Sequence, residues 1–156
     1  MKEVLDFLDS LNIEYNIINH PPIFTCDEGD KYVDGMEGVF TKSLFLAGKK
    51  DRNYYLFIMD ENRRLDIKAI SEVVGDKLHF AKEEDLSKKL GLYPGGVSLF
   101  GLLNNKEHDV KVYIDENIKN EEIITFHPND NSATLFFKIE DMYKVLKELD
   151  YDYKFI

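Results

Sequence analysis

The segment from Gly91 to Gly101 has the composition of a loop that lets a ligand approach the main chain. It reads GLYPGGVSLFG and holds four of the nine glycines and one of the four prolines of the chain. Glycine adopts backbone conformations closed to other residues, so such a loop can direct N–H groups at an anion or at a carbonyl oxygen. An ordinary turn between two elements has the same composition. The segment contains neither the Walker A phosphate motif nor the dinucleotide-binding glycine motif.

Two side chains outside this loop are suited to act on a bound group. Lys42 interrupts an apolar strand pattern, and a lysine in such a place needs either an anionic partner or an edge position from which its ammonium group reaches solvent. His127 ends a predicted strand and opens the segment HPNDNSAT, at a point where side chains can project into a cleft. The two asparagines of that segment are equally typical of a turn in which they bond their own backbone.

Other reaction types lack the residues that they need. The four histidines are scattered and the one cysteine, Cys26, has no partner at metal-ligand spacing, so we expect no metal site and no cofactor. A nucleophilic pair of Cys26 with a histidine stays an open alternative, whereas the serine-hydrolase elbow is absent because residues 96–100 read GVSLF. A lone cysteine also favours a reducing, cytoplasmic setting.

The chain is acidic, with a net charge of −10. This argues against general affinity for nucleic acid, including DNA, because binding to phosphate backbones rests on clustered Lys and Arg. Residues 42–89 are the exception, with eleven basic against nine acidic side chains. A basic face could form only there, from Lys42, Lys49, Lys50, Arg52, Arg63, Arg64, Lys68, Lys88 and Lys89. No stretch approaches the roughly 20 apolar residues of a membrane span, so we expect no membrane partner.

Hydrophobic spacing predicts the elements that position these residues. Helical periodicity or capping signals predict helices over residues 2–12, 27–36, 67–74, 83–90 and 140–149. Apolar runs and alternation predict strands over residues 14–19, 41–47, 54–59, 77–81, 110–114, 123–126 and 134–137. The strands 41–47 and 54–59 form a central hairpin. In the third helix we expect Asp66 as the N-cap, Val73 within the buried stripe and Gly75 as the stop. The pattern predicts one α/β domain over residues 1–156 with a mixed sheet.

The order of the motifs resembles a known family. TKSLFL at residues 41–46, RLD at 64–66, the loop 91–101 and HPNDNSAT at 127–134 are arranged as in the free-standing aminoacyl-tRNA deacylases related to the editing domain of bacterial prolyl-tRNA synthetase. The similarity covers nearly the whole chain and is greatest for the PrdX-like branch, the alanyl-tRNA(Pro) deacylases. It implies a mostly antiparallel, curved sheet flanked by helices. It also implies hydrolysis, in trans, of the ester that joins a mischarged alanine to proline tRNA.

The resemblance assigns roles to residues at matching positions. It implies that Lys42, His127 and Gly95 are catalytic: the lysine holds the 3′ end or the reacting group, the histidine positions substrate or water, and main-chain N–H groups of Gly95 and its neighbour stabilise an oxyanion. The substrate-binding residues that it implies are Gly96, Ser98, Asn131, Ser43 and His20. The substrate's own 2′-hydroxyl is implied in activating water, and a pocket that admits alanine but not proline is implied as the source of selectivity.

The partner implied is the acceptor end of tRNA(Pro) carrying a small amino acid, with prolyl-tRNA synthetase as a second partner. The chain departs from the family pattern at Leu99, where relatives commonly have proline, and at Phe40 and Ser43, which flank Lys42 where relatives have histidine and asparagine. Leu99 removes a rigid φ angle from the loop. Two alternatives therefore stay open: a deacylase for serine or another small amino acid, and a catalytically weak or silent adaptor that binds tRNA or the synthetase.

Overall fold

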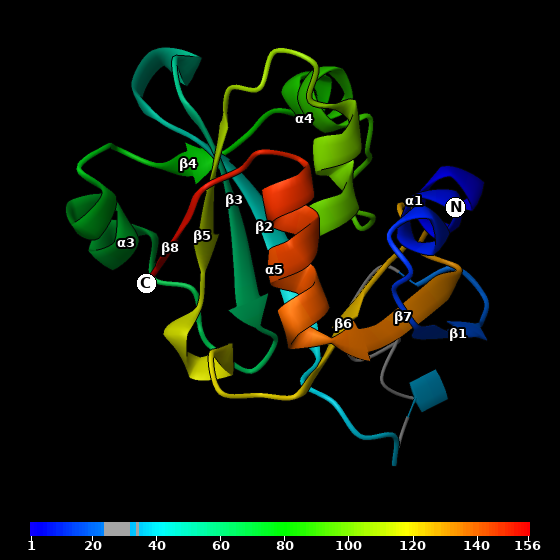
Figure 1. Ribbon diagram of the computed structural model, residues 1–156. Coiled ribbons are helices and arrows are strands. Elements are labelled where there is room, and N and C mark those ends of the chain that lie inside the picture. The colour runs from blue at the N-terminus through cyan, green and yellow to red at the C-terminus, as the bar shows by residue number, and fades with distance from the viewer. Residues whose placement is uncertain (24–31, 34) are drawn as a thin grey trace.

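The strands of the protein form two sheets that meet at one edge (Figure 1). The computed structural model describes residues 1–23, 32–33 and 35–156. The larger sheet has the order β4 (His79–Phe80), β2 (Thr41–Ala47), β3 (Tyr54–Asp60), β5 (Val110–Ile114) and β8 (Tyr153–Phe155). The smaller sheet has the order β1 (Tyr15–Asn19), β7 (Ala133–Lys138) and β6 (Ile123–Phe126). The predicted α/β class is confirmed.

Strand pairing is antiparallel in the smaller sheet and mixed in the larger one. β2 pairs antiparallel with β3 and β4, whereas β3 pairs in parallel with β5, and β5 with β8. The single sheet that we predicted is therefore divided. In the described ranges, one β-bridge joins the two parts, between Val39 and Ile124. Beyond it the main-chain pairing stops, and the Thr125 hydroxyl instead accepts a hydrogen bond from the Thr41 N–H (3.3 Å).

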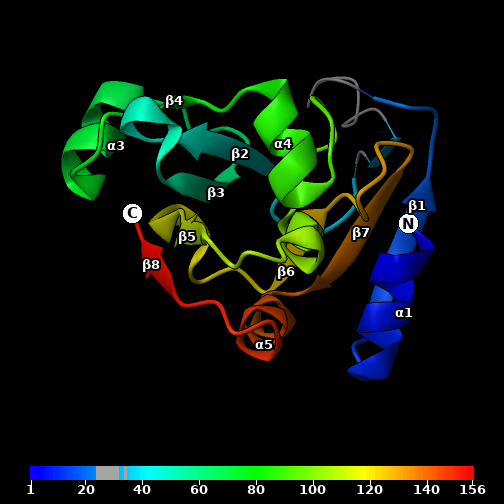
Figure 2. The same cartoon turned by 90° about the horizontal axis from the view of Figure 1, so that it is seen from above.

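In the part of the chain that the structure describes, four longer helices pack around the sheets: α1 (Lys2–Ser10), α3 (Ile67–Val74), α4 (Glu83–Leu90) and α5 (Ile139–Glu148). α1 lies against the smaller sheet, and α3 lies at the opposite end of the molecule (Figures 1 and 2). Short 3₁₀ helices occur at η1 (Lys49–Asp51), η2 (Leu99–Asn104) and η3 (Glu116–Ile118). None of the helices in the described ranges has the length and apolarity that crossing a bilayer requires.

α3 begins and ends where the sequence predicts, but its buried face is narrower than predicted. The Asp66 carboxylate accepts a hydrogen bond from the Ala69 N–H (3.0 Å), and Gly75 ends the helix with a left-handed φ of 80°, both as predicted. The prediction for Val73 is wrong, because its side chain is 70% exposed. α3 covers only the rim of the sheet, so Ile70 alone among its residues is fully buried.

The main hydrophobic core gathers one face of the larger sheet, the inner residues of β6 and β7, and the apolar faces of α1, α4 and α5. A second, smaller core on the other face of β2 and β3 includes Ile70 of α3. β3 is buried throughout except at its last residue, as expected for a central strand. The helix predicted over residues 27–36, and Cys26 with it, lies largely outside the described residues; Tyr32 and Val33 are helical.

Candidate active site

A cleft of about 420 Å³ opens where the two sheets meet. Its walls are the start of β2, the glycine-rich loop, the ends of β6 and β7, and the segment that enters α4. Of the predicted site residues, Lys42, Ser43, Gly95 and His127 line the cleft. The other four, Gly96, Ser98, Asn131 and His20, lie behind its wall.

Lys42 is the second residue of β2 and lines the cleft. Its Nζ donates to the carbonyl oxygen of Arg63 (2.5 Å), and no carboxylate of the described chain lies within ion-pair distance of it. The half-buried ammonium group is thus held by a neutral acceptor, which is neither the anionic partner nor the solvent-reaching position that we considered. Within the described residues, two of its three N–H donors have no acceptor, so they can serve a ligand in the cleft.

A buried carboxylate fixes the turn that holds Lys42. The Arg63 guanidinium donates to Asp115 Oδ1 (2.6 Å) and to the carbonyl oxygen of Ile156 (2.9 Å). Asp115 is fully buried, and its carboxylate also accepts from the N–H groups of Asp60 (3.0 Å) and Asn117 (2.9 Å). Asp115 follows β5 and Arg63 follows β3, so the parallel pairing of these strands sets the position of the carbonyl that Lys42 contacts.

His127 presents one ring nitrogen to the cleft. Its Nδ1 lies 2.9 Å from the carbonyl oxygen of Ala133. Because a carbonyl only accepts, Nδ1 carries the proton, and the lone pair of Nε2 on the neutral ring has no hydrogen-bond donor among the residues that the structure describes. Burial lowers the pKa of His127 below its ordinary value, against the opposing effect of the Ala133 carbonyl. The neutral ring can therefore accept a hydrogen bond, or a proton, from a hydroxyl group or water.

The lowered pKa of His127 predicts a pH-dependent stability. Below the ordinary histidine pKa of about 6.5 the unfolded ring takes up a proton while the folded ring does not, so the free energy of unfolding falls as pH falls, by at most about 1.4 kcal/mol per pH unit. His127→Asn keeps an N–H for the Ala133 carbonyl and does not titrate, so its stability should fall less between pH 7.5 and 5.5. Urea unfolding at the two pH values measures this, and equal losses in the two proteins would contradict it.

His20 supports the cleft from behind. Its Nδ1 lies 2.9 Å from the Pro21 carbonyl oxygen, so Nδ1 is the donor and Nε2 accepts from the hydroxyl of Thr134 (2.9 Å). The His20 ring also meets the ring of His127 edge-on, with 6.4 Å between centroids. His20 therefore orients Thr134 and His127, both of which line the cleft.

The glycine-rich loop contains a type II turn. Pro94 and Gly95 occupy its central positions, Gly95 has a φ of 87°, and the Gly96 N–H donates to the Tyr93 carbonyl (3.0 Å). The Gly96 N–H is thus consumed within the loop, which corrects the expectation that it stabilises an oxyanion. The Gly95 N–H has no acceptor among the residues that are described. A Cβ atom at Gly96 would lie 2.9 Å from the Tyr93 ring, so the close approach of that ring requires glycine at this position.

Ser98 and Asn131 tie this loop to the strand end that carries His127. The Ser98 hydroxyl donates to the His127 carbonyl oxygen (2.6 Å) and accepts from the Phe100 N–H (3.3 Å), which caps η2. The Asn131 amide accepts from the Tyr93 hydroxyl (3.1 Å) and donates to the Ile23 carbonyl (2.7 Å). Both side chains are buried. Both side chains hold the wall of the cleft in position. The turn in which a side chain bonds its own backbone, which we considered for the asparagines, is made by another residue.

That turn belongs to Asp130, whose carboxylate accepts from the Ser132 N–H (2.9 Å). Leu99, which removes a rigid φ angle from the loop, is fully buried as the first residue of η2. Packing therefore anchors the loop at this position.

The chain is similar to known proteins in sequence and in fold. The model of the aminoacyl-tRNA editing domain matches residues 20–145, which include every residue of the cleft. The chain belongs to this family.

Individual relatives support the same family assignment. The chain is 39% identical over 145 residues to the prolyl-tRNA editing protein ProX of Acetoanaerobium sticklandii, and the match covers 92% of this chain and 88% of that protein. It is 35% identical to the prolyl-tRNA synthetase associated domain-containing protein 1 of Danio rerio, over 94% of this chain and 81% of the relative. A solved structure described as a proposed trans-editing enzyme for prolyl tRNA synthetase shares the fold, with a TM-score of 0.72, 20% identity and coverage of 97% and 90%.

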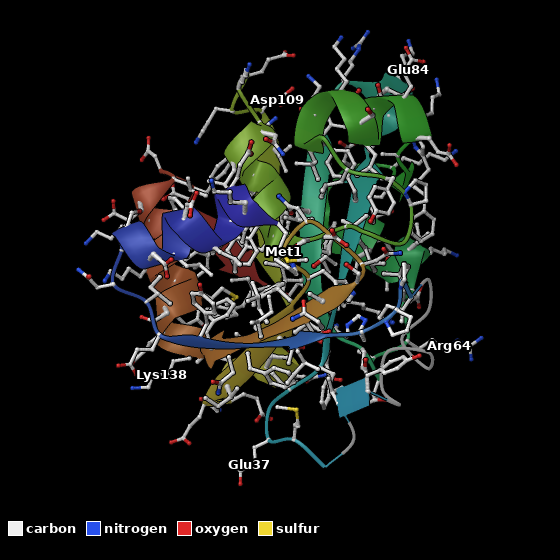
Figure 3. All side chains as sticks on the ribbon, turned by 90° about the vertical axis from the view of Figure 1, so that its right-hand side faces the viewer. Met1, Glu37, Arg64, Glu84, Asp109 and Lys138 are labelled. Atoms are coloured by element: carbon white, nitrogen blue, oxygen red, sulfur yellow. The ribbon has the colours of Figure 1, made fainter. Side chains whose placement is uncertain are left out.

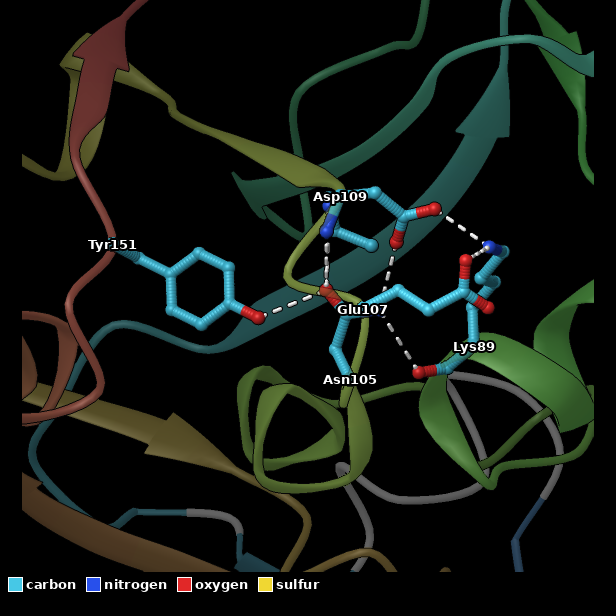
Figure 4. A network of polar contacts seen from close by, with 6 residues as sticks. Lys89, Asn105, Glu107, Asp109 and Tyr151 are labelled. Carbon is cyan, nitrogen blue, oxygen red and sulfur yellow. Dashed lines mark hydrogen bonds and ion pairs between the residues drawn. The ribbon is translucent and has the colours of Figure 1, made fainter.

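Two of the residues that could have formed a basic face make internal contacts instead. Lys89 is only 8% exposed, and its ammonium group contacts Asp109 (2.6 Å) and Glu107 (3.1 Å) (Figure 4). Arg63 is bound to Asp115 as described above. Its neighbour Arg64 instead extends away from the ribbon (Figure 3).

Sequence reasoning missed several residues of the editing domain's cleft: Phe80, Thr125, Thr134, Glu61 and Glu83. The two threonines stand near the ends of apolar strands, and that interruption was the available signal. Asp115 could have been found in the same way, as an acidic residue directly after the apolar strand VKVYI. Among the described side chains, no three His, Cys, Asp or Glu lie close enough together to hold a metal ion.

Proposed function

We propose that this editing domain hydrolyses the ester bond of alanyl-tRNA(Pro) in trans, releasing alanine and intact tRNA. Membership of the aminoacyl-tRNA editing family and 39% identity to a prolyl-tRNA editing protein support a deacylase that acts on mischarged proline tRNA. The observation that carries the chemistry is that one cleft holds the Lys42 ammonium group, the neutral ring of His127 and the main chain of Gly95.

These three groups have complementary tasks in ester hydrolysis. A water oxygen attacks the ester carbonyl carbon, negative charge develops on the carbonyl oxygen, and the bond to the ribose 3′ oxygen breaks as that oxygen takes the proton that water has lost. Lys42 and the Gly95 N–H are donors that can stabilise the developing charge. Nε2 of His127 accepts a hydrogen bond from the water or from the vicinal 2′-hydroxyl, which orients the attack.

The walls of the cleft favour alanine over serine. Phe40 and Leu44 give the cleft an apolar wall near the start of β2, and Val33 and Leu86 line the same cleft. A hydroxyl group placed against these side chains would lose its hydrogen bonds to water and gain none, at a cost of about 1–3 kcal/mol. Phe40, where relatives have histidine, is thus the departure from the family pattern that bears on amino-acid preference. Prolyl-tRNA synthetase, named in several relatives, is the second partner that we propose.

The function is tested by the release of labelled amino acid from alanyl-, seryl- and prolyl-tRNA(Pro). We expect alanine to be released fastest, serine to follow with kcat/KM lower by roughly 5- to 150-fold, the equivalent of the desolvation cost above, and proline to stay attached. A protein that binds all three tRNAs without hydrolysing any would be an adaptor. Equal rates for alanine and serine would contradict the selectivity attributed to Phe40 and Leu44.

A further inference from the structure

The edge of β2 that faces the cleft is open along most of its length. β4 pairs only with Leu46 and Ala47, the last two residues of β2. From Thr41 to Phe45 the strand has β3 on one side and the cleft on the other. We had expected β2 to be a central strand; only its C-terminal end is one.

The register shows which main-chain groups face that open edge. The contacts from the Glu61 N–H to the Phe40 carbonyl (2.9 Å) and from the Gly48 N–H to the Asn53 carbonyl (2.8 Å) place the even-numbered residues in the ladder with β3. Odd-numbered residues turn their N–H and C=O away from β3, because antiparallel pairs alternate in this way. Ile58, opposite Ser43, accordingly gives its carbonyl to the Asp115 N–H (2.8 Å) on the far side.

Ser43 is left with two unused main-chain groups. At one neighbouring odd position the Thr41 N–H donates to the Thr125 hydroxyl (3.3 Å), and at the other the Phe45 carbonyl accepts from the Ala81 N–H (3.1 Å). Between them, neither the N–H nor the C=O of Ser43 has a partner in the ranges that the structure describes. The Thr41 carbonyl and the Phe45 N–H on either side also lack a partner there, and Ser43 is the one residue of this stretch with both main-chain groups unpaired within the described ranges.

We propose that the aminoacyl group of the substrate pairs with Ser43 as a one-residue antiparallel strand. Its α-ammonium group donates to the Ser43 carbonyl, and the Ser43 N–H donates to the ester carbonyl oxygen. A hydrogen-bonded antiparallel pair exchanges these two bonds, and a single α-amino ester carries both of the groups required. The inference rests on the proposed function and assigns to Ser43 a main-chain role in holding the reacting ester.

The charge of the cleft agrees with a ligand that carries an ammonium group. Glu61 and Glu83 line the cleft with Lys42 as the one basic side chain among its described lining residues, and His127 is neutral at neutral pH. Carboxylate groups on this lining favour a cationic group of the ligand over a phosphate in the interior. In this pairing the N–H of Ser43 joins Lys42 and Gly95 as a third donor near the ester carbonyl oxygen.

Two variants at one position separate the main chain from the side chain. Ser43→Pro removes the N–H, which is not part of the β2–β3 ladder, and proline is tolerated at such an edge position. Ser43→Ala keeps both main-chain groups and removes only the hydroxyl, so it is the reference. We expect kcat/KM for alanyl-tRNA(Pro) to be about 10²- to 10³-fold lower in Ser43→Pro than in Ser43→Ala, the range for losing one oxyanion donor. Circular dichroism and thermal unfolding establish that both variants fold.

A substrate analogue tests the second bond without changing the protein. Propionyl-tRNA(Pro) has the size of alanyl-tRNA(Pro) but no ammonium group. With each rate divided by that of spontaneous hydrolysis, we expect the wild type to prefer the alanyl ester by about 10- to 100-fold, as for loss of a charged hydrogen bond. Equal rates for the two esters, or equal activity of the two folded variants, would overturn the docking mode while the wild type still releases alanine. A wild type that releases no alanine would overturn the proposed function itself.

Discussion

Lys42→Met is expected to lower kcat/KM for alanyl-tRNA(Pro) by about 10²- to 10³-fold, the effect typical of removing one charged or polar group that stabilises a developing oxyanion. Methionine keeps the length of the side-chain stem and its packing but removes the positive charge. The only protein contact that the ammonium group makes in the described chain is to the Arg63 carbonyl. Because Lys42 makes no ion pair there, the loss should fall on catalysis far more than on folding.

The measurement is single-turnover release of alanine, with urea unfolding in parallel. Lys147→Met is the matched control, since Lys147 is an exposed residue of α5 outside the cleft and outside the candidate basic face, and its replacement should leave the rate unchanged. Lys42→Arg is a further test: its wider, planar head cannot reproduce a point charge in the same space, so it should recover only part of the rate. Activity of Lys42→Met equal to that of the control would remove Lys42 from the reaction.

The second large effect is expected on stability. Asp115→Ala should lower the free energy of unfolding by about 3 kcal/mol, because removing one partner of a buried ion pair leaves the other uncompensated. Arg63 loses its carboxylate, and the N–H groups of Asp60 and Asn117 lose their acceptor. We place the figure at the low end of the usual range because the Arg63 side chain is 31% exposed, so water can reach it.

Urea unfolding at neutral pH measures the loss, and Asp51→Ala is the comparison. Asp51 also contacts two basic groups, His79 and Lys82, but at the surface, so its removal should cost much less. Introducing Arg63→Met into Asp115→Ala should recover part of the lost stability, because no unpaired guanidinium then remains. If Asp115→Ala were no more harmful than Asp51→Ala, the turn that holds Lys42 would not depend on the buried carboxylate.

Elements governed by neighbouring residues could be predicted from the amino-acid sequence. α4 begins at Glu83 and ends at Leu90 as expected, because acidic residues fill its first turn, Lys88 and Lys89 lie in its last, and Gly91 adopts the left-handed φ of 65° that ends it. The Asp66 cap, the Gly75 stop and strands β5 and β6 follow from equally local signals. β8 was missed, since its three residues are recruited by pairing with β5 and show no pattern of their own.

The residue types of the cleft were also available from the sequence, because the spacing of the motifs around Lys42, the glycine-rich loop and His127 indicated an editing domain. Their contacts were not. Whether the Ser98 hydroxyl is free for a substrate depends on the His127 carbonyl, 29 residues away in the chain, and whether Lys89 faces solvent depends on Asp109, 20 residues away. Such contacts join groups distant in sequence, so no local pattern encodes them.

The open edge of β2 is the clearest case. Seven residues with a strand pattern, Thr41–Ala47, looked like a central strand, and their composition is the same whether one edge or both edges are paired. Only the tertiary structure ends β4 after two residues and places the cleft beside Ser43. Side-chain alternation reports which face of a strand is buried, whereas the pairing of its edges is made by main-chain groups that every residue carries.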